Sequence, residues 1–175
     1  GYWVFDHACA QLEEWQAQGQ LVESISINVS AKQFHQKLFV DQVISVIESY
    51  NLLPSQLTLE LTEGVIIDDM VSLIEKLNKL KNYGVRISLD DFGTGYSSLA
   101  YLKHLPIDQL KIDKMFIHDI SIEKSSHHIV KTIIDLAEAM DLELIAEGIE
   151  ISQQFEILKN LGCKKFQGFF FSKAK

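Results

Sequence analysis

Cysteine is scarce in this sequence. Only Cys9 and Cys163 occur among its 175 residues, the first on an apparent amphipathic helix and the second beside an apparent strand. A disulfide framework needs several cysteines, and a structural zinc site needs closely spaced cysteine and histidine ligands. Neither class is therefore expected, and the simplest compartment for such a chain is the reducing cytoplasm.

Long apolar runs are also missing. No run approaches the roughly 20 residues that span a bilayer as a helix, and no charged segment followed by an apolar one opens the chain as in a secretory leader. We expect no membrane contact by these 175 residues. An anchor elsewhere, in a larger membrane-tethered protein, is compatible with them.

Basic residues are too few for a broad nucleic-acid surface. The chain has 16 Lys and Arg against 24 Asp and Glu, a formal net charge of −8, whereas duplex binding depends on clustered cations that displace counterions. DNA and RNA duplexes are therefore not expected as partners, and a small anionic ligand would need local positive charge. With 47% hydrophobic and 23% charged residues, the chain has the balance of one globular domain.

Apolar periodicity alternates between the helical and the strand pattern. Val4, Ala8, Leu12 and Trp15 share one stripe of a helix that ends at Gly19, and later segments repeat the pattern. The predicted helices are 2–18, 39–50, 70–83, 129–140 and 153–161, and the predicted strands are 24–29, 57–61, 85–90, 108–113, 142–148 and 164–171. Such alternation favours a parallel sheet covered by helices.

The parallel sheet could be open or closed into a barrel. An open dinucleotide-binding sheet should show a glycine fingerprint after its first strand, but SISINVSAKQF (24–34) contains no glycine. The sequence therefore favours an α/β fold that is a partial (β/α) TIM-like barrel, with about six βα units of a modified eight-stranded barrel.

Polar side chains follow the apolar strands at their carboxyl ends. In chain order they are Asn28, Glu60, Asp90, Asp91, Lys111, Glu147 and Gln167. In a (β/α) barrel these ends open on one face, where active-site residues gather. A carboxylate in that position is costly to desolvate unless it is paired or bound to a cation. Several carboxylates on one rim therefore favour a divalent metal, although ordinary ion pairs are the alternative for each acid alone.

The ligand atoms indicate which metal to expect. Asn28, Glu60, Asp90 and Asp91 offer only oxygen, which favours Mg²⁺ or Mn²⁺ over zinc. Adjacent aspartates can face different ions, and two ions about 3.5 to 4 Å apart suit hydrolysis of a phosphodiester. Lys111 would then orient the attacking water or neutralise developing charge, unless it is a solvated lysine at a strand end.

Two familiar motifs within SLDDFGTGYSSL (88–99) do not hold. The triplet DFG (91–93) resembles the kinase magnesium triplet, but no kinase catalytic loop precedes it, and Ser98 breaks the G-x-G-x-x-G pattern of a phosphate-binding loop. A metal-assisted enolising enzyme with Lys111 as its base stays open on chemistry alone. The adjacent aspartates and the glycine-rich loop after them disfavour that alternative.

The polar strand ends lie in a set of motifs that resembles the EAL-type cyclic-di-GMP phosphodiesterase domain. In order and spacing the motifs are NVS (28–30), ELTE (60–63), DDFGTGYSSL (90–99), LKID (110–113), AEGIE (146–150) and QGFFFS (167–172). The resemblance covers nearly the whole chain. It implies a modified TIM barrel that cleaves one phosphodiester of cyclic di-GMP to give linear pGpG, with Mg²⁺ or Mn²⁺ as cofactor.

The resemblance also implies a role for each matching residue. The metal shell is Asn28, Glu60, Asp90, Asp91 and Glu147; the catalytic residues are Lys111 and Glu147; Gln167 binds substrate. The loop after Asp91 is anchored through Glu63 and shaped by Gly93, Gly95 and Ser97. For the hydroxyl residues of that loop, ordinary turn chemistry and helix capping are the alternative.

The chain departs from the family pattern at both ends. It contains no Glu-Ala-Leu tripeptide and no arginine near one; in the family both lie upstream of the helix at 2–18, and a closing helix follows the last motif. We therefore expect residues 1–175 to be a single EAL-type domain fragment without its N-terminal strands and closing C-terminal helix. An open sheet of this kind favours a homodimer or other self-association.

Three functional classes fit the sequence. A cyclic-di-GMP phosphodiesterase is favoured, because every motif position present keeps the polar residue that the chemistry needs. Without one metal ligand and the phosphate arginine, the chain alone is expected to hydrolyse cyclic di-GMP weakly or not at all. A catalytically silent cyclic-di-GMP receptor is the main alternative, and an interaction scaffold with neither property is the third.

Overall fold

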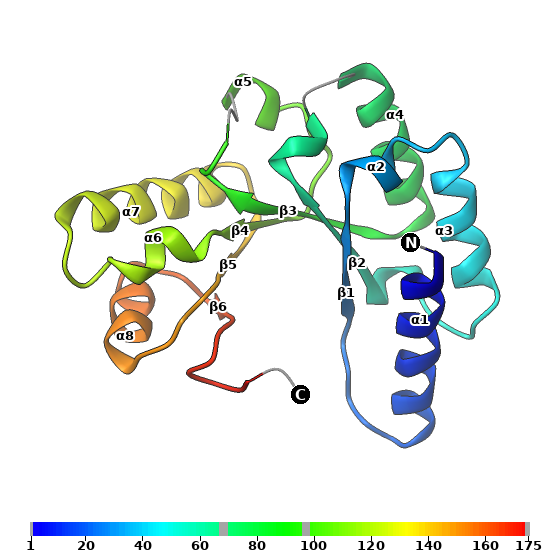
Figure 1. Cartoon of the computed structure of the whole chain (residues 1–175), viewed down its shortest axis with the longest axis horizontal. Coiled ribbons are helices and arrows are strands. Elements are labelled where there is room, and N and C mark those ends of the chain that lie inside the picture. The colour runs from blue at the N-terminus through cyan, green and yellow to red at the C-terminus, as the bar shows by residue number, and fades with distance from the viewer. Residues whose placement is uncertain (1, 67–69, 96–98, 174–175) are drawn as a thin grey trace. The chain divides into compact units, whose positions relative to one another are not determined.

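The computed structural model describes residues 2–66, 70–95 and 99–173. The chain falls into two compact units, one formed by residues 1–88 with 104–107 and the other by residues 89–103 with 108–175. Figure 1 shows the helices and strands along the chain. That residues 1–175 act as a single domain stays a prediction.

The first unit consists of two parallel strands and the helices that cover them. Its elements are α1 (Tyr2–Ala17), β1 (Ile25–Val29), α2 (Ala31–Phe34), α3 (Phe39–Glu48), the 3₁₀ helix η1 (Pro54–Gln56), β2 (Leu57–Thr62), the 3₁₀ helix η2 (Glu63–Ile66) and α4 (Met70–Tyr83). Strands β1 and β2 pair in parallel. Helix α1 packs against β1 and α3, and α3 packs against α4. Strand β3 (Arg86–Phe92) begins in this unit and continues into the second.

The core of the first unit follows from helical spacing. Helix α1 buries Phe5, Cys9 and Leu12, and α4 buries Leu73 and Leu77 among others. Residues three or four apart lie on the same face of a helix, so each set forms one apolar stripe. The strands present buried side chains to these stripes, and β2 is buried along nearly its whole length.

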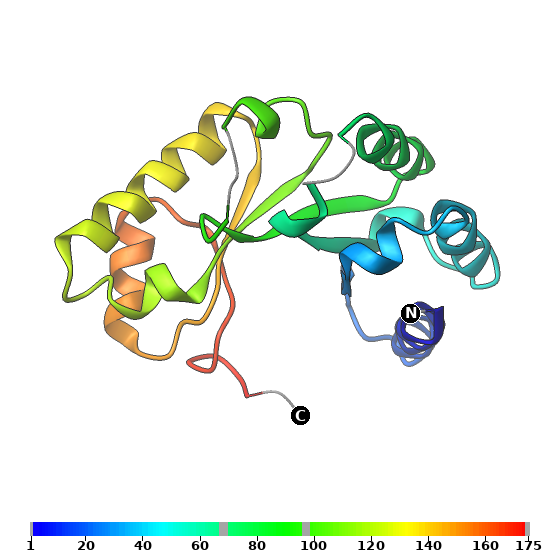
Figure 2. The same cartoon turned by 45° about the horizontal axis from the view of Figure 1, so that its top comes forward.

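The second unit has the same alternation. Its elements are α5 (Leu99–Leu102), β4 (Gln109–Ile112), α6 (Lys114–His118), α7 (Lys124–Ala139), β5 (Glu143–Ala146), α8 (Ser152–Asn160) and β6 (Lys165–Phe166). Strand β5 pairs in parallel with β4 on one side and with β6 on the other. Helix α7 packs against β4, β5 and α6 (Figure 2).

All six predicted strands are present, and the sheet takes them in chain order from β1 to β6. The prediction of a parallel α/β fold is therefore confirmed. The predicted helix 129–140 begins earlier, at Lys124, because its first turn is polar and leaves no apolar period to read. The predicted strand 164–171 ends at Phe166; beyond it the backbone turns, with the amide of Phe171 donating to the carbonyl of Gly168 at 3.1 Å.

The short helices α2 and α6, which follow strands β1 and β4, were not among the predicted helices. Helices α2 and α6 have four and five residues, which is too short for a readable apolar period. Each has an N-cap in the sequence: the hydroxyl of Ser30 accepts from the amide of Gln33, and the carboxylate of Asp113 accepts from the amide of Met115. Such side-chain acceptors satisfy the free amides of a first helical turn, so the caps were the available signal.

Among the residues that the structure describes, no helix is both long enough and apolar enough to cross a membrane.

Candidate metal centre

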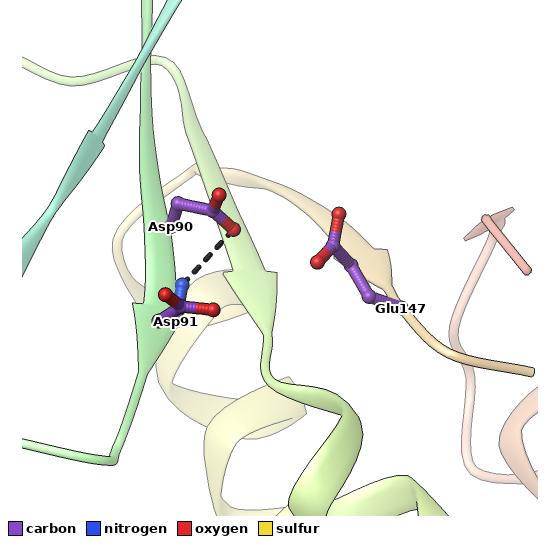
Figure 3. Close-up of side chains that lie close together, drawn as sticks. All are labelled: Asp90, Asp91 and Glu147. Carbon is purple, nitrogen blue, oxygen red and sulfur yellow. Dashed lines mark hydrogen bonds between the residues drawn. The ribbon is translucent and has the colours of Figure 1, made fainter. Parts of the chain in front are cut away.

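Three carboxylates of the second unit meet at the ends of its strands. Asp90 and Asp91 lie at the end of β3 and Glu147 follows β5, and one oxygen from each lies within 4.8 Å of the others (Figure 3). Asp90 is buried, whereas Asp91 and Glu147 are partly exposed. The predicted convergence of strand ends therefore holds for these three residues.

The backbone at Asp91 explains how two adjacent residues can serve one site. Successive side chains of a regular strand point to opposite faces, but Asp91 has a φ of 53°, in the left-handed region that aspartate tolerates better than most residues. This bend ends the regular pleat. The amide of Asp91 donates to Oδ1 of Asp90 at 3.0 Å, which holds the Asp90 carboxylate beside the bend (Figure 3).

Lys111 lies between two of the carboxylates. Its Nζ is 3.3 Å from Oδ1 of Asp90 and 2.5 Å from Oε1 of Glu147, and the residue is 2% exposed. The register of the sheet produces this contact: Lys111 of β4 pairs with Ile145 of β5, and Glu147 comes two residues later, on the same face. A buried ammonium at this position offsets part of the repulsion between the carboxylates.

The pKa of Asp91 is raised from 3.8 to about 6. Burial is the largest cause; a hydrogen bond with the Asp113 side chain and the negative charges of Asp90 and Asp113 add to it, while Lys111 lowers it. A hydrogen bond between two carboxyl groups requires one of them to carry a proton. The site therefore holds an exchangeable proton up to about pH 6, at a position where a cation would compete with it.

Asp113 is the residue of this site that sequence reasoning missed. It ends the LKID motif directly after β4 and caps α6, with its Oδ1 accepting from the amide of Met115 at 2.6 Å. The signal was available, because Asp113 is the next polar residue after Lys111, two positions further along at the carboxyl end of the same strand. In the sequence, Asp113 resembles an ordinary helix cap. In the structure, it also contacts Asp91.

The donor set fits a hard divalent cation. All three clustered ligands are carboxylates, the oxygen donors that Mg²⁺, Mn²⁺ and Ca²⁺ prefer. Two oxygens on opposite sides of one Mg²⁺ lie about 4.2 Å apart, so oxygens within 4.8 Å of one another need only small side-chain rotations to share an ion. Divalent metal use by this cluster is therefore supported by its chemistry and its spacing.

The predicted metal ligands of the first unit lie on paired strands. Asn28 of β1 is opposite Glu60 of β2 in the parallel register. Asn28 is exposed, while Glu60 and Glu63, the latter at the start of η2, are 6% and 7% exposed. Because side chains opposite each other in a parallel pair share a face, Asn28 and Glu60 are neighbours. Their metal-binding roles, and the anchoring role of Glu63, stay predictions.

Gln167 follows β6 and is fixed by its backbone. Its amide donates to the carbonyl of Ala146 at 2.9 Å, and its carbonyl accepts from the amide of Ile149 at 3.1 Å. These bonds place Gln167 beside the segment that contains Glu147. Its side chain is exposed, and its role in binding substrate stays a prediction.

The loop after Asp91 is described only in part. Gly93 has a φ of 96°, which a residue with a side chain rarely adopts, and Gly95 is exposed. Thr94 closes the turn, since its Oγ1 donates to the carbonyl of Asp91 at 2.8 Å. Ser97, the third predicted residue of this loop, lies outside the described residues.

Comparisons with known proteins identify the family. The family model described as EAL domain matches residues 1–174. The bifunctional diguanylate cyclase/cyclic di-GMP phosphodiesterase MucR of Pseudomonas aeruginosa is 43% identical over 169 residues, which cover 97% of this chain and 25% of MucR. Across the curated relatives, the chain spans 22% to 28% of their length.

Solved structures show the same likeness. A structure described as PaMucR phosphodiesterase, c-di-GMP complex, is 42% identical with a TM-score of 0.94, over 99% of this chain and 70% of that one. The manganese/cyclic-di-GMP complex of Klebsiella pneumoniae BlrP1 is 26% identical with a TM-score of 0.85, over 98% of this chain and 44% of that one. The fold, the clustered carboxylates and the match over nearly every residue together show that this chain belongs to the EAL domain family.

Proposed function

We propose that this chain is the catalytic part of a cyclic-di-GMP phosphodiesterase, which hydrolyses one phosphodiester of cyclic di-GMP to linear pGpG. One observation carries the proposal: the carboxylates of Asp90, Asp91 and Glu147 gather within 4.8 Å of one another beside the buried Lys111. Membership in the EAL family and the likeness to a MucR structure solved with cyclic di-GMP support this substrate.

The cofactor of this function is Mg²⁺ or Mn²⁺, as two ions. Oxygen-only ligands favour these hard cations, and the similar BlrP1 structure was solved with manganese and cyclic di-GMP. When bound, such ions polarise the attacking water and the phosphate oxygens. Asp90, Asp91 and Glu147 would hold them. The family motifs add Asn28 and Glu60 as ligands, Gln167 as a substrate contact, and Glu63 with Gly93, Gly95 and Ser97 as the residues of the loop.

Lys111 supplies fixed positive charge. Its ammonium is directed at Oδ1 of Asp90 and Oε1 of Glu147, so it balances part of the negative charge of these carboxylates. Negative charge on the phosphate oxygens grows during attack, and a cation already in place stabilises that charge without reorganising. Glu147 shares this ion pair and is suited to hold the water against Lys111.

The test is production of pGpG by the purified chain, alone and extended at its N-terminus, with cyclic di-GMP and Mn²⁺. We expect EDTA to stop the reaction and Asp90→Asn to slow it by about 100-fold or more. Asp135→Asn is the matched control, since Asp135 is an exposed carboxylate on α7 in an ion pair with Lys131; it should leave the rate unchanged. Binding of cyclic di-GMP without pGpG in either version would instead establish a silent receptor.

The same proposal places the domain in a larger signalling protein of the cytoplasm. The curated relatives are about four times as long as the part that this chain matches, and they include a protein named for signalling. Cys9 and Cys163 are free thiols, which suits a reducing compartment. Fractionation of cells that express the full-length protein would test the assignment.

A further inference from the structure

Gly148, directly after Glu147, lies against the start of α6. Its φ is +69°, and a Cβ built on it would lie 2.4 Å from Cβ and 3.2 Å from Cα of Lys114. Real Cβ atoms do not approach other carbons this closely. The backbone that carries Glu147 therefore packs on α6 in a way that only glycine allows.

Gly93, two residues after Asp91, lies against the same helix. A Cβ on Gly93 would be 2.8 Å from Cε2 and 3.1 Å from Cζ of Phe116. The φ of +96° at Gly93 adds a second reason for glycine. The turn that follows the aspartate pair is thus seated on the Phe116 ring.

A third contact joins α6 to the carboxylates directly. Asp113, the N-cap of α6, accepts from the amide of Met115 and shares a hydrogen bond with Asp91. Residues 113–116, which we call the α6 turn, therefore touch the β3 end through Asp91 and Gly93 and the β5 end through Gly148. The α6 turn follows β4, which carries Lys111.

We propose that the α6 turn sets the distance between Asp91 and Glu147, and that Gly148 and Gly93 are positioning residues for the cation that these carboxylates bind. This inference rests on the metal centre of the proposed function and adds the element that fixes its geometry. Both positioning residues are glycines, which have no side-chain atom that could ligate an ion.

A shift of the backbone at Gly148 would also move the adjacent residue, Glu147. The amide of Glu147 donates to the carbonyl of Ile112, which ties its N-terminal side to the sheet. On the C-terminal side, the amide of Ile149 donates to the carbonyl of Gln167 at 3.1 Å, and its carbonyl accepts from the amide of Phe170 at 2.9 Å. A side chain at position 148 must therefore bend the short segment between these two fixed points.

The decisive variant is Gly148→Ala, and Gly19→Ala is its matched control. Gly19 has nearly the same φ, +73°, but nothing within 4 Å of its Cβ position. Both variants place an alanine in left-handed backbone, so both should lower the melting temperature, and Gly148→Ala should lower it further because of its contact with Lys114. Only Gly148→Ala should weaken Mn²⁺ binding, by about tenfold or more as for other residues that support metal ligands. Isothermal titration of the purified protein without nucleotide measures this affinity.

A second variant separates positioning from loss of folding. Lys114→Gly removes the atom that lies 2.4 Å from the Gly148 Cβ position, so Gly148→Ala with Lys114→Gly should recover most of the Mn²⁺ affinity while keeping the lowered melting temperature. A general structural defect would recover neither property.

Mn²⁺ affinity of Gly148→Ala equal to that of Gly19→Ala would overturn the inference. So would a double variant that stays as weak as Gly148→Ala. Wild-type protein that binds Mn²⁺ but releases no pGpG refutes only the proposed hydrolysis and leaves the positioning role standing. Wild-type protein that binds no Mn²⁺ refutes both.

Discussion

Lys111 and Glu147 form an ion pair across neighbouring parallel strands, with Nζ 2.5 Å from Oε1. The same ammonium reaches Asp90 at 3.3 Å. The lysine thus balances negative charge that bound metal ions would otherwise have to balance alone. It therefore contributes to the stability of the fold as well as to the proposed reaction.

Lys111→Met should destabilise the protein. Two largely buried carboxylates would lose their cation, and removal of one partner of a buried pair costs on the order of 3 kcal/mol in unfolding free energy. Excess Mn²⁺ should restore much of that stability by replacing the charge. Urea unfolding with EDTA and with Mn²⁺ measures both effects. Lys131→Met is the control, because its pair with Asp135 is exposed and should matter by less than about 1 kcal/mol.

Asp91 should respond to substitution in two separable ways. Asp91→Asn keeps a side chain that tolerates the φ of 53° and should retain the melting temperature while losing Mn²⁺ affinity. Asp91→Val should in addition cost about 2 kcal/mol, since a β-branched residue is strained in left-handed backbone. Equal melting temperatures for the two variants would contradict the role given to this bend.

The raised pKa of Asp91 also predicts that the stability of the protein depends on pH. Its pKa of about 6 exceeds the value of 3.8 for a free aspartate, so between these values the folded chain binds more protons than the unfolded chain. The Asp91 contribution to stability is therefore greatest below about pH 4 and is lost as the pH rises through 6. Urea unfolding in EDTA should show this trend in the wild type relative to Asp91→Asn.

The same proton competes with the cation. Mn²⁺ affinity should fall as the pH drops below about 6, because Asp91 must release its proton to act as a ligand. Titration of Mn²⁺ at pH 5 and pH 7 measures the difference. An affinity that does not change over this range would show that Asp91 is not a ligand.

The two thiols should be unreactive in the folded protein. Cys9 is 0% exposed, and burial, with the charge of Asp6, raises its pKa to about 11. Cys163 is also buried, and burial raises its pKa. A coloured disulfide reagent added to the native protein should therefore label neither cysteine within minutes. After addition of denaturant it should label two thiols per chain. Fast labelling of either cysteine without denaturant would contradict this burial.

Self-association stays a prediction with a structural basis. Strands β1 and β6 are the first and last of the sheet, and an edge strand offers amides and carbonyls to another chain. We expect sedimentation velocity of the 175-residue chain to show dimers or larger species. A single monomeric boundary across concentrations would refute the expectation.

The order of the helices and strands could be predicted because most of them are long enough to show a regular spacing of apolar residues in the sequence. The stripe of α1 and the strands β1 to β5 all gave readable patterns, and so did the polar residue at each strand end. The short helices α2 and α6 could not be found this way, and the aromatic run Phe169–Phe171 resembles a strand although it forms a turn. In that turn Phe171 and Phe170 pack around Phe155 of α8, a tertiary contact that no local pattern contains.

The metal cluster was predictable in composition but not in geometry. Strand ends indicated Asp90, Asp91 and Glu147 as neighbours, whereas the left-handed bend at Asp91 and the second contact of Asp113 depend on packing between elements. The same holds for Gly148. The sequence alone does not indicate why glycine is needed there, because the reason is the contact with Lys114 of α6.

The bend at Asp91 has a consequence for how this centre can change over generations. Two negative charges on one side of the sheet come from adjacent codons joined by a single unusual peptide conformation. One codon inserted between them would put the second carboxylate one residue further along the chain, about 3.3 Å away from its present place at the bend. Length changes here should therefore be as damaging as loss of an aspartate itself.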